Sequence, residues 1–358
     1  MVLQSNVAVG LAVVAAVYAS FYLYLQSCKR TVESEARSGC IPFHLPNFTI
    51  TSLPNRLVLF LSSLRRFLID RPNRGVSNAM KVQCELAKEG ECDSPKIRTI
   101  YFIRHGQSIW NMTFDYRSNI LLILWRVVRL IATELFFSPT NDTFLYDSPL
   151  SINGINQALE MSKKLCNPES ANCEDIKLLT RHSDKRCALF TSNLRRAQST
   201  IMLALHDRLS HTNDVVEVCN ELEELVPHPD CVALSTTFQS STIPLLEIMM
   251  VPDKAKSYSR FLRHYYGPGV STRSAYERMI EFNNRIFNRK EENIIVCGHS
   301  SWIRNYLSIF LPKGSQDMEF CHKKIGNLDT LRVDVQCHEG RYYSVDPNSV
   351  KLVYKNTK

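Results

Sequence analysis

The chain has 358 residues, of which 44% are hydrophobic, enough to bury one substantial α/β domain and to carry further segments at its start. Its formal net charge of +8 is modest and no basic motif is interleaved with aromatic residues, so no nucleic-acid partner is expected. The twelve cysteines contain no C-x-x-C spacing, and neither H-E-x-x-H nor a G-x-x-x-x-G-K-[ST] loop occurs, so no cofactor and no metal are predicted.

An uncharged, strongly apolar run occupies residues 7–25. As a helix this run would be about 28 Å long, close to the thickness of a hydrocarbon core, so it predicts a membrane anchor within residues 1–30. The alternative is a signal peptide cleaved after Ala19. The run continues past that position and no positively charged region precedes it, so the anchor is favoured.

Charges on either side of this run give an orientation. Lys29 and Arg30 follow it, whereas no lysine or arginine precedes it. The positive-inside rule therefore predicts a single-pass membrane protein whose main domain is in the cytosol. The cysteine count and the N-x-T glycosylation sequons favour the opposite side, since both can be used in a lumen; the sequons are at Asn47, Asn111 and Asn141.

A connector with several prolines covers residues 31–96. Within it, the stretch Asn55–Ile69 holds leucines, phenylalanines and three arginines. This composition after Pro54 predicts a short amphipathic helix. Packing of that helix against the main domain is favoured over contact with a membrane.

Two buried strands are each followed by a histidine. The apolar run Ile100–Ile103 predicts a strand over residues 97–104, which ends in Arg104-His105-Gly106. A second strand is predicted over 293–298 and is followed by His299. Ligands of open α/β sheets bind at the carboxyl ends of the strands, so the two histidines indicate one site.

Between these strands a helix is predicted over about residues 116–137. Its sequence is apolar on nearly all sides, but the charges of Arg126, Arg129 and Glu134 argue against a second membrane span. A helix this apolar is expected to bury most of its surface. The favoured interpretation is a cap on the sheet domain beside the site; the alternative is a helix whose exposed face enters a membrane interface.

Strands alternate with helices along the rest of the chain. This order predicts an α/β fold with a mostly parallel, doubly wound sheet that has helices on both faces. The last two strands are expected to form an antiparallel edge. The further strands are expected at 187–191, 214–219, 328–335 and 341–346, and the helices at 154–166, 194–209, 271–288 and 301–310.

Four segments carry motifs in a known order. They are R-H-G-x-x-x-x-N at 104–111, L-S-x-x-G-x-x-Q-A at 150–158, T-S-x-L-x-R-A-x-x-T at 191–200 and G-H-S at 298–300. With these motifs the chain resembles the histidine phosphatase superfamily, in its phosphoglycerate-mutase-like branch, over about residues 97–335. The resemblance implies a phosphoglycerate-mutase-like fold, a histidine phosphatase domain at 97–358 with an insert at 112–146, and catalysis without a metal.

The motifs supply the parts that phosphoryl transfer needs, which are an in-line nucleophile and donors around the phosphoryl oxygens. His105 is the expected nucleophile, through a phosphohistidine, and His299 would add a donor or a positive charge. Arg104 and Arg196 are the expected phosphate ligands, since the planar guanidinium suits phosphate oxygens. The amide of Asn111 would add a further donor.

The acid for the leaving oxygen is chosen among three carboxylates. The L-x-E-[I/L] pattern of the family falls on Leu222–Leu225 and selects Glu224, and burial would raise its pKa. Glu221 and Glu223 remain alternatives. Arg195, which directly precedes Arg196 in the T-S-x-L-x-R-A-x-x-T motif, is expected to be a solvated helix residue.

Together these features predict a membrane-anchored phosphomonoesterase that hydrolyses phosphate esters through a phosphohistidine. The chain after Glu224 lacks the E-R-R-like run of the glycolytic mutases, which argues against mutase activity. The alternatives are a protein phosphatase acting on phosphoproteins and a catalytically idle module that binds phosphorylated ligands. The expected partners are a small phosphate ester or a phosphoprotein as substrate, and a membrane through residues 7–25.

Overall fold

The computed structural model describes residues 52–68, 76, 78–79, 82–83, 95–115, 117–138, 140, 142–167, 173–180, 185–234, 243–264, 274–312, 314–315, 319–338 and 342–356. The strands are β1 (Lys96–Arg104), β2 (Cys187–Ser192), β3 (Val216–Cys219), β4 (Leu262–His264), β5 (Asn293–Gly298), β6 (Thr330–His338), β7 (Tyr342–Val345) and β8 (Lys351–Tyr354). The helices are α2 (Ser52–Leu68), α4 (Ile109–Thr113), α5 (Ile120–Phe136), α6 (Ile152–Leu165), α7 (Glu174–Leu179), α8 (Arg195–Ala204), α9 (His206–His211), α10 (Leu245–Met250), α11 (Pro252–Lys256), α12 (Tyr258–Phe261), α13 (Ala275–Phe287), α14 (Ser300–Phe310) and α15 (Glu319–His322), with short 3-10 helices η2 (Asn220–Leu222), η3 (Pro229–Cys231) and η4 (Pro347–Ser349).

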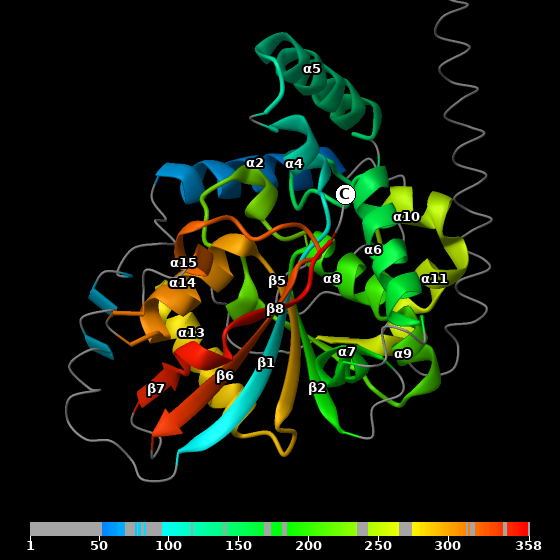
Figure 1. The fold of residues 1–358 in the computed structure, drawn as a ribbon. Helices are drawn as coiled ribbons and strands as arrows, with labels where there is room; N and C mark the ends of the chain where they lie inside the picture. Colours follow the sequence, from blue (N-terminus) through cyan, green and yellow to red (C-terminus); the bar gives the residue numbers. More distant parts are fainter. Residues whose placement is uncertain are drawn as a thin grey trace, which may run out of the picture.

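An eight-stranded sheet forms the centre of the molecule (Figure 1). Its strands follow the order β4-β3-β2-β5-β1-β6-β7, and β8 also pairs with β6. Neighbours from β4 to β1 are parallel, whereas β6 runs antiparallel to β1, β7 and β8. The prediction of a mostly parallel α/β sheet with an antiparallel edge is therefore confirmed.

Both faces of the sheet are buried under helices. In β1, Tyr101 and Ile103 face a core that includes residues of α6 and α8, while Ile100 and Phe102 face a core that includes residues of α13 and α14. Aromatic and β-branched side chains that alternate between two buried faces stabilise a central strand, by about 1.5–3 kcal/mol for each fully buried side chain. Figure 1 shows these two groups of helices on opposite sides of the sheet. The stable core thus holds β1 and β5 side by side, and with them the chain that follows each strand.

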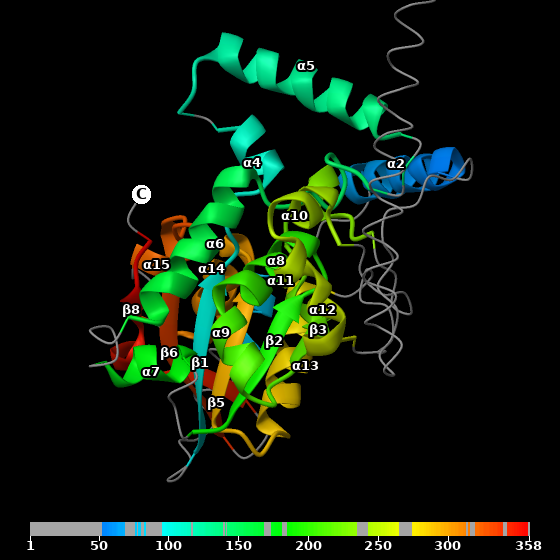
Figure 2. The same ribbon diagram turned by 90° about the vertical axis from the view of Figure 1, so that its right-hand side faces the viewer.

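Two helices present apolar side chains to solvent. Figure 2 shows α5 standing clear of the sheet, above α4 and α10. On α5 only Leu130 is buried, and Trp125 is 62% exposed. The expectation that this helix buries most of its surface is wrong, because only one stripe of it faces the rest of the protein. The exposed large apolar side chains are Leu57, Val58, Phe60, Leu61, Leu64, Phe67 and Leu68 on α2, and Ile120, Leu121, Leu122, Leu124, Trp125, Val128, Ile131 and Leu135 on α5.

The predicted membrane location is corrected by the structure. No helix in the described part of the chain is long and apolar enough to cross a membrane. The two longest, α2 and α5, have 17 residues each, so each spans about 26 Å, less than a hydrocarbon core of about 30 Å. The prediction of a single-pass membrane protein with a cytosolic catalytic domain is therefore wrong for the residues that the structure describes. Residues 7–25, where the anchor was expected, lie outside them.

Candidate active site

The predicted site residues follow the carboxyl ends of neighbouring parallel strands. His105 follows β1 and His299 follows β5, which is the neighbour of β1 in the sheet. The backbone N–H of His105 donates to the carbonyl of Gly298 at 3.0 Å, and the two imidazole ring centres are 5.1 Å apart. Arg196 lies in the first turn of α8, after β2, and Glu224 follows η2, after β3. The sheet order thus brings four segments that are distant in sequence to one edge.

The ring of His105 is held with one nitrogen ready to react. Its Nδ1 lies 2.6 Å from the carbonyl oxygen of Gly106, and because a carbonyl only accepts, Nδ1 carries the proton. The lone pair is then on Nε2. Burial lowers the pKa of His105 well below its usual value, and the charges of Arg196 and Arg104 lower it further. A neutral imidazole with a free Nε2 is the form required of a nucleophile.

The loop that carries His105 is fixed on several sides. The N–H of Gly106 donates to Thr200 Oγ1 at 3.0 Å, and Asn327 Nδ2 donates to the carbonyl of His105 at 2.8 Å. A Cβ atom on Gly154, in the first turn of α6, would lie 2.1 Å from the carbonyl oxygen of Gln107. Glycine at this motif position therefore lets α6 approach the loop, and any larger residue would displace it.

Two buried arginines flank the histidines. Arg104 donates from Nη1 to the carbonyl of Ile325, and burial lowers its pKa to about 10. Arg196 donates from Nη1 to the carbonyl of Asp230 at 2.7 Å. Burial, the largest single influence, acts to lower the pKa of Arg196, but Asp230 and its other acidic neighbours together outweigh it and the pKa is raised. In both arginines the buried Nε has no hydrogen-bond partner among the described residues.

His299 and Asn111 also have buried polar atoms without a partner. His299 Nε2 lies 2.8 Å from Ser192 Oγ. Its Nδ1 is 3.9 Å from Glu224 Oε2 and has no hydrogen-bond partner in the part of the chain that the structure describes. Burial, followed by the charge of Arg196, lowers the pKa of His299 well below its usual value. Asn111 is in α4, and no described residue forms a hydrogen bond with its buried side-chain amide oxygen. An unsatisfied buried polar group costs about 1–3 kcal/mol, so these atoms favour a polar ligand.

Only one of the three candidate carboxylates approaches the histidines. Glu221 forms an ion pair with Arg285. Glu223 forms an ion pair with Arg66, which lowers its pKa although burial alone would raise it. Among the described residues, Glu224 forms no ion pair with an arginine or a lysine, and burial raises its pKa above the usual value. Glu224 is thus the carboxyl group best placed to hold and donate a proton.

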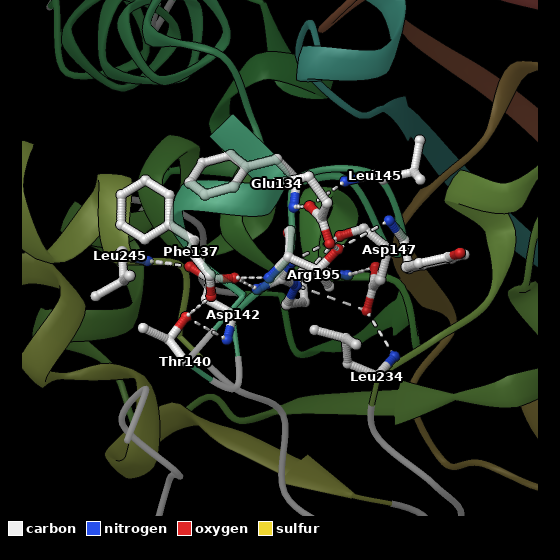
Figure 3. A network of polar contacts seen from close by, with 12 residues as sticks. Glu134, Phe137, Thr140, Asp142, Leu145, Asp147, Arg195, Leu234 and Leu245 are labelled. Carbon is white, nitrogen blue, oxygen red and sulfur yellow. Dashed lines mark hydrogen bonds and ion pairs between the residues drawn. The ribbon is translucent and has the colours of Figure 1, made fainter. Parts of the chain in front are cut away.

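Arg195 differs from its expected role. It is 1% exposed rather than solvated, and Figure 3 shows it at the centre of a polar network. Its Nη1 donates to Asp142 Oδ1 at 2.5 Å, and its backbone N–H donates to Asp147 Oδ1 at 2.8 Å. Asp147 also accepts the N–H of Leu234 at 3.1 Å. The network fixes the first turn of α8, and with it the position of Arg196.

The same network reaches the exposed helices. Glu134 of α5 accepts a hydrogen bond from Thr143 Oγ1 and one from the N–H of Phe144, both at 2.7 Å, and it pairs with Arg56 of α2. Sequence reasoning missed this network. Only Asp147 had a sequence signal nearby, because it lies three residues before the L-S-x-x-G-x-x-Q-A motif at 150–158.

The arrangement fits a dianionic phosphoryl group. Two arginines can supply positive charge, a neutral histidine can supply a nucleophile and a carboxyl group of raised pKa can supply a proton. Within the described ranges, no group of three or more His, Cys, Asp or Glu side chains could hold a metal ion.

Comparison with protein-family models and with curated proteins finds no match. Among solved structures, the chain is similar to a mycobacterial glucosyl-3-phosphoglycerate phosphatase, with 14% identity over 71% of this chain and 98% of that chain at a TM-score of 0.36. It is also similar to a phosphoserine phosphatase from Entamoeba histolytica, with 14% identity over 72% of this chain and 96% of that chain at a TM-score of 0.32. A phosphoglycerate mutase from Bacillus anthracis is similar with 15% identity over 70% of this chain and 92% of that chain at a TM-score of 0.36.

These solved structures are members of the histidine phosphatase superfamily, which is the family that the sequence motifs resemble.

Proposed function

We propose that the chain is a phosphomonoesterase that hydrolyses phosphate esters through a phosphohistidine at His105. The observation that carries the proposal is the set of buried, unpartnered polar atoms on Arg104, Arg196 and His299 at the strand ends beside His105. The oxygens of one phosphoryl group would satisfy all of them. Charge-assisted hydrogen bonds from buried arginines to such oxygens are among the strongest that proteins form.

In the first step, His105 Nε2 attacks phosphorus and the bond from phosphorus to the ester oxygen breaks. The electron pair goes to the departing oxygen, which takes the proton of Glu224. Arg104 and Arg196 stabilise the charge on the three equatorial oxygens during the transfer. The products are an alcohol, an ionised Glu224 and a phosphohistidine.

In the second step, a water molecule attacks the phosphohistidine. Glu224, now a carboxylate, takes a proton from that water, and the bond between phosphorus and Nε2 breaks with its electron pair returning to the imidazole. Inorganic phosphate leaves and both side chains regain their starting protonation states. The same carboxyl group thus acts as acid and then as base.

The test is phosphoenzyme formation in a His105→Ala variant, with His211→Ala as control because His211 lies on the surface of α9. The wild type and the control should hydrolyse an aryl phosphate and retain an acid-labile radiolabel from a labelled substrate. His105→Ala should do neither. Undiminished hydrolysis by that variant would refute the mechanism, and an inactive wild type would favour the idle binding module.

A further inference from the structure

Helices α2 and α5 turn charged side chains toward the protein. On α5, Glu134 pairs with Arg56 of α2, and Arg126 donates from Nη1 to a backbone carbonyl of α4 at 3.0 Å. On α2, Arg66 pairs with Glu223. The side chains of both ion pairs are only 12% to 15% exposed. Turning either helix over would separate a buried ion pair, which is strongly destabilising, so the orientation of both helices is fixed.

The opposite face of α5 is a row of exposed apolar side chains, which we call the α5 seam. Its members are three and four residues apart in turn, and each is between 52% and 70% exposed: Leu121, Leu124, Val128, Ile131 and Leu135. This alternating spacing is the pattern by which the side chains of two helices interlock in a coiled coil. Helix α2 repeats the spacing with the exposed side chains Leu57, Phe60, Leu64 and Phe67.

The apolar surface on these two helices is larger than a monomer normally leaves exposed. At about 100 Å² for each half-exposed large side chain, the exposed apolar residues of α2 and α5 together present on the order of 1,500 Å². The largest apolar patch of a typical monomer is about 300–600 Å². A stable interface buries about 800 Å² on each partner. The surface of α2 and α5 is therefore sufficient for a stable interface.

The charges on these helices favour a protein partner over a lipid surface. Helices that lie on membranes are rich in lysine and arginine beside their apolar face. Neither α2 nor α5 contains a lysine, and of their arginines only Arg65 and Arg129 are exposed. The α5 seam itself carries no charge, so two copies of it can meet without repulsion between like charges. A second copy of the same chain is the partner that this self-complementary surface fits.

We propose that the chain forms a twofold symmetric dimer in which the α5 seams of two copies pack against each other. Figure 2 shows α5 lying across one end of the molecule, so a twofold axis normal to that end makes the two α5 helices antiparallel. Val128 is the middle residue of the seam and meets its own copy on the axis. Helix α2, which Arg56 ties to the last turns of α5, extends the contact on both sides. This inference goes beyond the proposed function and does not depend on it.

Sedimentation equilibrium of the full-length protein tests the dimer. The wild type should have twice the chain mass of 41.1 kDa. Leu124→Glu/Ile131→Glu places charges in both halves of the seam and should sediment as a monomer, with a dissociation constant at least about 100-fold higher. The control Ile97→Glu should remain a dimer, because it changes an equally exposed apolar side chain at the amino end of β1, away from α5. Far-UV circular dichroism should show that both variants remain folded.

Cross-linking tests the antiparallel arrangement. With a short bismaleimide, Val128→Cys should give covalent dimers, because the two thiols meet on the twofold axis. Ile97→Cys should not exceed the level of the wild type, which the native cysteines set.

A monomeric wild type would overturn the proposal, and so would a dimer that Leu124→Glu/Ile131→Glu leaves intact. Absence of cross-links through Val128→Cys would overturn the antiparallel pairing. Phosphatidylserine vesicles provide a test of the other occupant. A wild-type monomer that binds these vesicles, when Leu124→Glu/Ile131→Glu does not, would assign the seam to a lipid surface instead of a second copy.

Discussion

Replacing Arg195 with methionine should destabilise the protein strongly, although Arg195 is not expected to touch the substrate. Its side chain is 1% exposed and lies between Asp142 and Asp147, whose side chains are fully buried. Methionine fills a similar volume but leaves both carboxylates without their cation. Removing one partner of a buried ion pair typically costs about 3–5 kcal/mol.

The loss of stability in the Arg195→Met variant should depend on pH. Burial raises the pKa of Asp147, and Arg195 is the largest influence that opposes this rise. Without Arg195 the folded protein favours the protonated carboxyl group still more, so the variant should regain stability as the pH falls. At about 2–4 °C per kcal/mol for a domain of this size, the expected decrease of Tm is about 6–20 °C at pH 8 and less at pH 5.

Thermal unfolding at pH 5 and pH 8 measures this effect. A suitable control is Arg208→Met, because Arg208 is similarly buried but its partner Asp214 keeps 21% of its side chain exposed to water. The double variant Arg195→Met/Asp142→Asn should have a higher Tm than the sum of the Tm losses of its two single variants predicts. The reason is that the neutral amide at position 142 no longer needs a cation. A Tm within about 3 °C of the wild type, or a loss that is the same at both pH values, would refute the reasoning.

Two further predictions concern carboxyl groups. Glu224→Gln should slow the hydrolysis of alkyl phosphates more than that of aryl phosphates, because only the alkyl leaving oxygen needs a proton. The decline of kcat/KM at high pH, which reports the raised pKa of Glu224, should also disappear in this variant. Equal slowing of both substrate types, or the same selectivity from Glu221→Gln, would contradict the assignment. Burial raises the pKa of Glu247 to about 7, so the folded state binds the extra proton and loses stability, on the order of 3 kcal/mol, as the pH rises from about 4.5 to 7. Glu247→Gln should remove this dependence, and calorimetry that finds the same pH slope in the variant would show that another group causes it.

The sequence was sufficient for the central strands and the motif residues. Strands β1, β2 and β5 are buried on both faces, so their apolar runs are continuous and easily found. Strand β4 was not found, because its three residues carry too little pattern, and β8 was missed although β3 and β7, which also have four residues, were found. Strands β4 and β8 pair only because longer neighbours present a free edge. The expected helix over 194–209 is interrupted at Leu205, and it forms α8 and α9 instead.

The partners of the site residues could not be predicted. Arg196 is held by Asp230, and Arg66 pairs with Glu223 from a helix that precedes the sheet in the sequence. Such pairs depend on how loops fold over the sheet edge, and neither spacing nor composition encodes them. The exposure of α5 was also missed, because its composition predicts burial and only its tertiary contacts decide which stripe is covered.

The order of the strands also governs when this protein can assemble during its synthesis. Strand β1 lies between β5 and β6, which emerge from the ribosome much later than β1 itself. At about 5–20 residues per second, the chain from Arg104 to Asn293 takes on the order of 10 to 40 s to make. Throughout that interval the apolar segment Ile100–Ile103 has no sheet neighbour, so it depends on chaperones or on transient contacts to stay out of aggregates. His105 and His299 can meet only after residue 299 of the 358 has been translated, and a truncated product could contain the R-H-G motif without any active site.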